Sequence, residues 1–332
     1  MAYSSGGLIE ATDYNGFVNV GANNVNRVWS TGSTDAGWGE TALSTVSVGG
    51  TVTATNWASL VNTLTTMGNQ TNTTITSRTA PVTGNTISIL ANVATDINNI
   101  TTNRGNAALS GTISTAFTGT TSKTAATAAN AAGWTITFTH TVTFASADAA
   151  RYFFNAGGLI RIDMSKTSTG SDKDPDWNSF VGTVGSLFLS GRVNSAAQTI
   201  AGTSYTGFTR SGGSGTPSPN LTTTGWYSFT GGAAATTMWQ LNSVTSPYTA
   251  DFIRVTAAVN AGRTILTLIT TWVDGGYAGA GKDNSISGGT ATTSPFSTFG
   301  TAPTVLVRFV PPSSTYLTTA AWGTPAVAAS VA

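Results

Sequence analysis

The sequence predicts an α+β protein that is mostly β, with a helical N-terminal part followed by an antiparallel β-sandwich or jelly-roll-like domain. Before about residue 110, apolar residues recur at the three- and four-residue spacing of helices. After it, apolar and polar residues alternate with a period of two, between Gly- and Ser-rich joints. Threonine makes up roughly a fifth of the chain, and a β-branched hydroxyl residue suits the solvent face of a strand.

The first two helices are predicted from apolar residues that share one helical face, at 13–29 and at 56–68. Thr12 and Thr55 directly precede the apolar residues and are suitable N-caps. Between the two helices, residues 46–52 alternate apolar and polar side chains around a Gly-Gly pair. We expect a small hairpin there.

A third helix is predicted at about 87–103, where Leu90, Val93, Ile97 and Ile100 follow one another at steps of three, four and three. This spacing is the seam of a short coiled-coil-like helix, so these four residues are candidates for oligomerisation. In the alternative interpretation, the same stripe lies on the other two helices of its own chain. The sequence favours neither.

Helical patterns are absent after residue 110, and strand patterns replace them. In the clearest strand, residues 134–144, the apolar side chains and His140 point to one face and five threonines to the other, as in a half-buried antiparallel strand. Further strands are expected at Leu159–Met164, Leu187–Val193, Phe252–Val259, Thr264–Val273 and Thr304–Phe309.

These patterns divide the chain into four parts. Residues 1–110 form a helical region for attachment and oligomerisation, and residues 111–130 form a Thr- and Ala-rich connector. Residues 131–310 form the antiparallel β domain. The tail, 311–332, begins with two prolines and is expected to run extended along a surface or a neighbour.

The low charge of the chain argues against several functions. Lys and Arg together number 14 and Asp and Glu 13, so only 8% of the 332 residues are charged, against roughly a quarter in an average domain. General acid-base catalysis draws on the residue types that are scarce here, so we expect no enzyme and no cofactor. No basic run could bind nucleic acid, and no apolar run could span a membrane.

Metal binding has two weak candidates. His140 is the only histidine, and no cysteine is present. A hydrogen-bonded core histidine is the favoured interpretation, and a metal site shared between copies is the alternative. Asp172, Asp174 and Asp176 resemble the start of a calcium loop, but Trp177 and Thr183 stand where that loop needs Gly and Glu. A solvated turn is favoured over a weak Ca²⁺ or sugar contact.

Aromatic residues near Gly-rich loops are the candidate ligand-binding groups, since aromatic platforms bind neutral sugars. Core packing is the favoured interpretation for each one taken singly. The candidates for facing a glycan are Trp226, Tyr227, Trp239, Tyr248 and Tyr277.

Several motifs resemble a family of virion structural proteins of tailed bacteriophages, notably phages of marine and cyanobacterial hosts, of the tail fibre-like or appendage type. The motifs are Ala150–Ile162 (ARYFFNAGGLIRI), Thr102–Ala107 (TNRGNA), the alternating strand that ends at Phe144, Asp176–Asn178 (DWN) and Ile269–Asp274 (ITTWVD) with the glycines after it. The predicted N-terminal helices look like those of the same family, so the resemblance extends over most of the chain. These motifs describe a fold, and the resemblance implies no catalytic residues.

This resemblance implies a virion component, and we expect a tail-associated fibre or appendage that assembles as an oligomer, with a trimer favoured. Its partners would be copies of itself and other virion proteins. The alternatives are a capsid decoration or head-fibre protein and a carbohydrate-binding adhesin at a fibre tip. Residues 1–15 show no secretory signal pattern, so synthesis in the host cytoplasm is expected.

Overall fold

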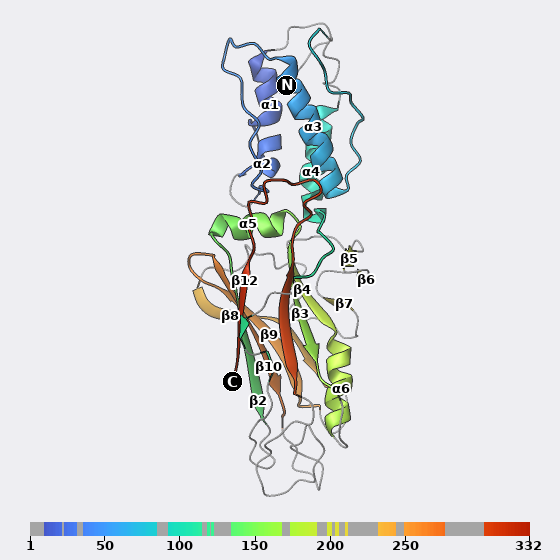
Figure 1. Ribbon diagram of the computed structural model, residues 1–332, viewed down its shortest axis with the longest axis vertical. Coiled ribbons are helices and arrows are strands. Elements are labelled where there is room, and N and C mark those ends of the chain that lie inside the picture. The colour runs from blue at the N-terminus through green and yellow to red at the C-terminus, as the bar shows by residue number, and fades with distance from the viewer. Residues whose placement is uncertain are drawn as a thin grey trace, which may run out of the picture.

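The computed structural model is α+β, with the N-terminal helices at one end of an elongated molecule and the β-sheets at the other (Figure 1). It describes residues 10–21, 23–31, 36–84, 92–114, 118–119, 121–122, 134–167, 173–190, 198–200, 203–205, 210–211, 232–243, 249–275 and 302–332. The helices of the N-terminal part are α1 (Ala11–Val18), α2 (Val25–Trp29), α3 (Ala54–Thr71), α4 (Val93–Asn103) and the 3₁₀ turn η1 (Arg104–Asn106).

The first predicted helix is broken in two, because α1 ends at Val18 and α2 starts only at Val25. Two residues explain the break. Gly21 takes a positive φ of 84°, which a helix cannot contain. Asn24 then caps α2, since its side chain accepts a hydrogen bond from the backbone of Arg27.

The predicted hairpin at 46–52 is wrong, although a turn is present there. Gly50 N–H donates to the carbonyl of Ser47 at 2.8 Å, but no strands form on either side. The extended segment is bound by helix side chains instead. The amide of Asn15 in α1 exchanges two hydrogen bonds with the backbone of Val46, and that of Asn26 in α2 does the same with Leu43.

Helix α3 is longer than predicted at both ends. Thr53 caps it in a reciprocal box with Asn56, and it passes Gly68 to end at Thr71. Asn72 then takes the left-handed conformation at φ 51°. Gly68 is needed for close packing inside the helix, because a Cβ there would lie 3.0 Å from the carbonyl of Thr73.

The apolar stripe of α4 lies inside its own chain. Val93, Ile97 and Ile100 are 1%, 2% and 0% exposed, and α4 packs against α1 and α3. Leu90, the fourth residue of the predicted seam, lies outside the described residues. The three described side chains therefore have no free surface for a second copy, as in the intrachain alternative.

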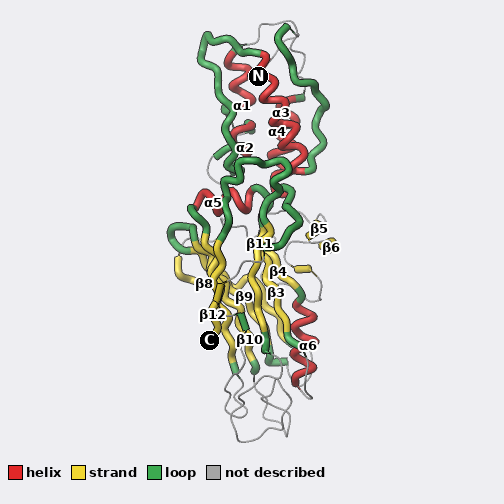
Figure 2. Tube along the Cα trace, in the orientation of Figure 1, coloured by secondary structure: helices red, strands yellow, loops and turns green. Residues whose placement is uncertain are grey.

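The β part contains two main sheets that are antiparallel apart from one short edge pair (Figure 2). The six-stranded sheet has the order β1-β12-β2-β10-β9-β8, and the four-stranded sheet β11-β3-β4-β7. A separate pair joins β5 (Gln198–Ile200) and β6 (Thr203–Tyr205). The remaining strands are β1 (Thr118–Gly119), β2 (Thr135–Thr143), β3 (Leu159–Ser165), β4 (Ser186–Ser190), β7 (Arg210–Ser211), β8 (Gly232–Asn242), β9 (Phe252–Val259), β10 (Ile265–Val273), β11 (Thr304–Val310) and β12 (Ala326–Val331).

The strands predicted from period-two alternation are confirmed within the described residues, and the end of the predicted strand Leu187–Val193, residues 191–193, lies outside them. Exposed or half-buried and buried residues alternate along β2, β9 and β10 without a break. The buried faces of both main sheets contribute to one hydrophobic core, which also includes side chains from α1, α3 and α4. A single core therefore connects the helical part with the β part.

The expectation that helices are absent after residue 110 is wrong, because α5 (Ala147–Asn155) and α6 (Lys173–Val184) lie there. Helix α5 is capped by Ser146, whose side chain accepts from the backbone of Ala149 at 2.9 Å. Its last turn holds Tyr152, Phe153 and Phe154, whose β propensity concealed the helix. All three are buried where the helical and β parts meet.

The tail becomes part of the six-stranded sheet, whereas an extended path along a surface was expected. β12 pairs with β2 from Ala326 to Val331. The connector takes part as well. Its β1 pairs with β12, while Ser114 and Thr121 on either side bond to the backbone of Phe309 and Val305 in β11. One segment thus joins the edges of the two main sheets.

The helical and β parts are held together by buried polar contacts. Gln70 in α3 is 0% exposed, and its amide donates to the carbonyls of Ala108 and Ala156. The carboxylate of Glu40 accepts from the backbone and hydroxyl of Thr319, at 3.0 and 2.7 Å. These bonds link α3 to the residue that follows α5, and the segment after α2 to the loop between β11 and β12.

Candidate functional site

The glycan-facing interpretation finds no support at Trp239, the one candidate aromatic among the described residues. Trp239 lies in β8 with 0% exposure, as part of the core. A Trp inside the core presents no face to a sugar. Trp226, Tyr227, Tyr248 and Tyr277 lie outside the described residues.

His140 is a core residue on the inner face of β2, with 0% exposure. Burial lowers its pKa from 6.5 to about 4, and the nearby backbone of Val305 opposes part of this shift. The ring is therefore neutral at pH 7. The predicted hydrogen bond is absent, since neither ring nitrogen has a partner in normal hydrogen-bond geometry.

The expected solvated turn is wrong for the described part of Asp172–Asp176, because the chain is helical from Lys173 onward as part of α6, and Asp172 lies outside the described residues. Asp176 is buried, and its carboxylate accepts from the hydroxyl of Ser243 at 3.4 Å. The next residue, Trp177, stacks on Trp272 of β10 with ring centroids 5.6 Å apart. In the described part of the chain, no three or more His, Cys, Asp or Glu side chains gather to hold a metal ion.

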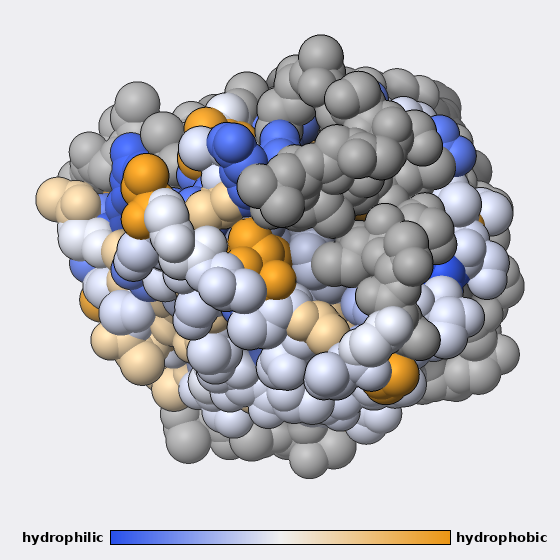
Figure 3. All heavy atoms as spheres, turned by 90° about the horizontal axis from the view of Figure 1, so that it is seen from above, coloured by the Kyte–Doolittle hydropathy of each residue, from blue (hydrophilic) through white to orange (hydrophobic). Residues whose placement is uncertain are grey.

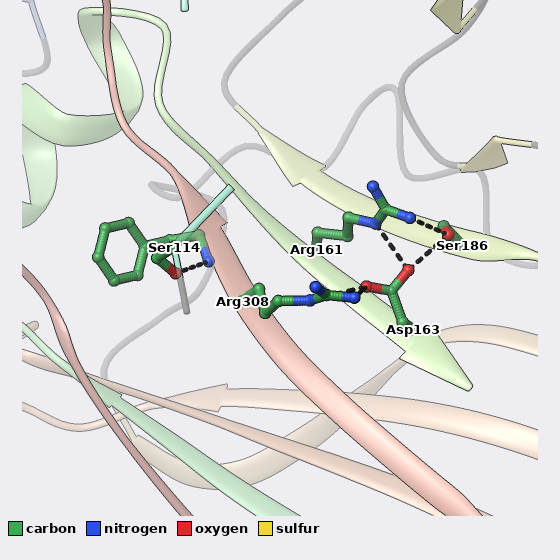
Figure 4. Close-up of polar contacts among 6 residues, drawn as sticks. Ser114, Arg161, Asp163, Ser186 and Arg308 are labelled. Carbon is green, nitrogen blue, oxygen red and sulfur yellow. Dashed lines mark hydrogen bonds and ion pairs between the residues drawn. The ribbon is translucent and has the colours of Figure 1, made fainter. Parts of the chain in front are cut away.

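A charged cluster spans three strands of the four-stranded sheet (Figure 4). Asp163 of β3 accepts from Arg161 Nε at 2.6 Å and from the hydroxyl of Ser186 on β4 at 2.6 Å. Arg308 of β11 donates to its other oxygen at 2.7 Å. Arg161 and Asp163 share one face of β3 because they are two residues apart, and sheet pairing adds Arg308 and Ser186.

This cluster has the chemistry of a cross-strand clamp. Both carboxylate oxygens of Asp163 are occupied by donors, and its side chain is only 15% exposed. The alternation of apolar and polar residues in β11 could have placed Arg308 outward, but the sequence holds no signal for its register against Asp163.

The outward side of the six-stranded sheet is a regular surface formed by alternate side chains of adjacent strands. We call it the threonine face. It consists of Thr135, Thr137, Thr139, Thr141 and Thr143 of β2, Ile265, Thr267, Ile269, Thr271 and Val273 of β10, Phe252, Arg254, Thr256 and Ala258 of β9, and Ala326, Ala328 and Ser330 of β12. These side chains are exposed or half-buried.

Neither a described helix nor a described sheet covers the threonine face. Helix α6 packs along β3 in the other sheet, and α5 lies across the end of the β part (Figure 1). Cross-strand pairs such as Thr141 with Thr267 bring hydroxyl groups together in rows. The face can therefore form hydrogen bonds and apolar contacts without a charged group.

The described surface at the helical end has mixed hydropathy. Seen from above, its coloured residues are mostly pale, the colour of intermediate hydropathy, with several deep blue and orange side chains among them (Figure 3). The exposed large hydrophobic residues among those described are Val20, Val48 and Val82. None of the helices that the structure describes is both long and apolar enough to cross a membrane.

Comparisons with protein-family models, with curated proteins and with solved structures gave no match to this chain. The fold and the threonine face are therefore interpreted from their own chemistry.

Proposed function

We propose that this chain is a structural component of a tailed-phage virion, a tail-associated fibre or appendage protein that assembles from several copies. The observation that carries the proposal is the threonine face, a broad sheet surface with almost no charge on an elongated chain. The sequence motifs that resemble virion proteins agree with it. We also propose that the two main sheets form a β-sandwich around their shared core.

A neutral surface suits repeated copies in a particle. Contacts made from hydrogen bonds and apolar area depend little on salt, whereas exposed ion pairs are screened. With a net charge of +1 over 332 residues, copies packed together repel one another little. The protein can then keep its contacts across the range of ionic strengths that a free particle meets.

The helical part and the β part of the molecule have different roles in this proposal. The helical part attaches to other virion proteins, and the β part contacts further copies of the chain. We assign self-association to the β part because Val93, Ile97 and Ile100 are already buried within one chain. This assignment replaces the coiled-coil seam that the sequence suggested.

Mass spectrometry of purified particles, with labelled peptides of this chain as standards, tests the proposal. We expect the chain in intact particles at a few to some tens of copies, together with tail proteins after mild dissociation. Hundreds of copies per particle would place it on the capsid surface instead. Its absence from purified particles would overturn the proposed function.

A further inference from the structure

We propose that the threonine face is the surface through which the chain binds a second copy of itself. This inference rests on the proposed function, which requires several copies, and it names the strands that join them. The argument depends on the charge of the face, on its apolar residues and on its area.

Charge favours a copy of the chain over a different partner. The described outward side chains of β2, β9, β10 and β12 include one charged group, Arg254. Its Nε donates to Gln240 Oε1 at 2.7 Å, and its guanidinium lies 4.7 Å from the ring centroid of Phe252. This charge is thus engaged within the chain. A charged partner gains no complementary group here, whereas an identical neutral face brings no repulsion.

Apolar residues lie at the centre of the face. β10 stands between β2 and β9, and three of its five outward side chains are Ile265, Ile269 and Val273. The row of threonines on β2 flanks them on one side. Apolar side chains beside a row of uncharged hydrogen-bonding groups are typical of the core and rim of a protein–protein interface.

The area of the face is near the lower limit for a specific contact. Its four adjacent strands, β12, β2, β10 and β9, have six to nine residues each. At about 4.8 Å between strands and about 3.3 Å per residue, the plane of this part of the sheet measures about 500 Å². A stable interface of standard size buries about 800 Å² on each partner. Two such faces can stack about 10 Å apart, as in sheet-on-sheet packing.

Light scattering of the purified full chain at 10 μM measures the mass of the assembly and so tests whether the threonine face joins two copies. Wild type is compared with a variant that has two lysine substitutions on the face. We expect the wild type to have the mass of two or more chains. Thr139→Lys with Thr267→Lys adds two charges to adjacent strands without touching the core, and we expect the mass of one chain. Thr102→Lys, on the exposed side of α4, is the control and should keep the wild-type mass.

Single cysteines give a second measurement, because the chain has none of its own. Thr267→Cys should form cross-linked dimers with a short bis-maleimide, and Thr102→Cys should not. If the lysine variant fails to fold, the cross-linking still shows whether the threonine face is the interface between copies. The proposal that the threonine face binds a second copy is overturned by any of three results: a monomeric wild type, a folded lysine variant of unchanged mass, or equal cross-linking at both positions. Failure of the proposed function is seen separately, as absence of the chain from particles.

Discussion

His140 is a neutral histidine in the core, where burial lowers its pKa to about 4. In the unfolded chain the pKa is about 6.5, so between these values the unfolded chain binds more protons than the folded one. The free energy of unfolding therefore falls as the pH falls from 6.5 toward 4. The total loss from this group is about 3 kcal/mol.

His140→Leu should remove this pH dependence. Leucine suits the apolar surroundings, and it leaves no unpaired ring nitrogen in the core. Urea unfolding of both proteins from pH 7.5 to pH 4.5 measures the effect. The variant should gain stability relative to the wild type as the pH falls. Parallel curves for the two proteins would show that His140 is not held neutral by the fold.

Asp163 is the second residue whose role can be measured, because it holds two arginines on neighbouring strands. Asp163→Asn removes the negative charge and leaves Arg161 and Arg308 facing each other. Because the three side chains are 14–28% exposed, we expect a loss of about 2 kcal/mol, below the cost for a fully buried pair.

Asp148→Asn is the matched control for Asp163→Asn. Asp148 also pairs with an arginine, Arg151, but its side chain is 66% exposed. An exposed pair contributes little, so the control should change the free energy of unfolding by at most about 0.5 kcal/mol. If urea unfolding showed the same loss of unfolding free energy for both substitutions, Asp163 would not hold the three strands together as described.

At the scale of elements, the long segment after α2 is held by side-chain amides instead of a strand partner. Asn26 is 6% exposed and makes both hydrogen bonds to Leu43. Asn26→Ala leaves the backbone groups of Leu43 without these partners, and we expect a loss of about 2 kcal/mol. Thermal unfolding measures the loss, and proteolysis should cut the segment 41–52 sooner.

Asn23→Ala serves as the control, since the single bond from Asn23 to Asn98 is exposed. Removing a solvated bond of this kind should leave the melting temperature nearly unchanged. If Asn26→Ala behaved like this control, the amides would not be what holds the segment.

Single helices and strands were predicted correctly where apolar residues recurred at one constant spacing over many residues. The alternation in 134–144 and 252–259 identified β2 and β9, because a half-buried strand needs that pattern. Prediction failed where the signal was short or mixed. α5 has nine residues and ends in aromatic side chains, and α6 begins among aspartates that indicated a loop.

At the scale of the whole molecule, the C-terminal strand β12 connects the six-stranded sheet to the connector, which also bonds to the four-stranded sheet. β12 lies between β2 and β1, and the connector joins it to the edge near β11. Removing residues 326–332 exposes the edge of β2 and the inner face beneath Val327, which is 5% exposed. We expect a chain that is largely insoluble or rapidly digested by protease.

Removing Ala332 alone is the control for this truncation. Ala332 exchanges two backbone hydrogen bonds with Thr137 at the end of the strand, so its loss should cost about 1 kcal/mol. A soluble, cooperatively folding chain without residues 326–332 would show that β12 is dispensable.

The sequence by itself determined the α+β class, the helical-then-β order, the inward face of each long strand and the scarcity of charge. These properties follow from local periodicity and composition, which need no knowledge of distant contacts. Only the tertiary structure decided that the α4 stripe is buried within its own chain, that Trp239 lies in the core, that Arg308 reaches Asp163 and that the tail is a sheet strand. Each of these depends on which segments, far apart in the sequence, become neighbours, and period-two or helical spacing specifies a face but not the partner that covers it.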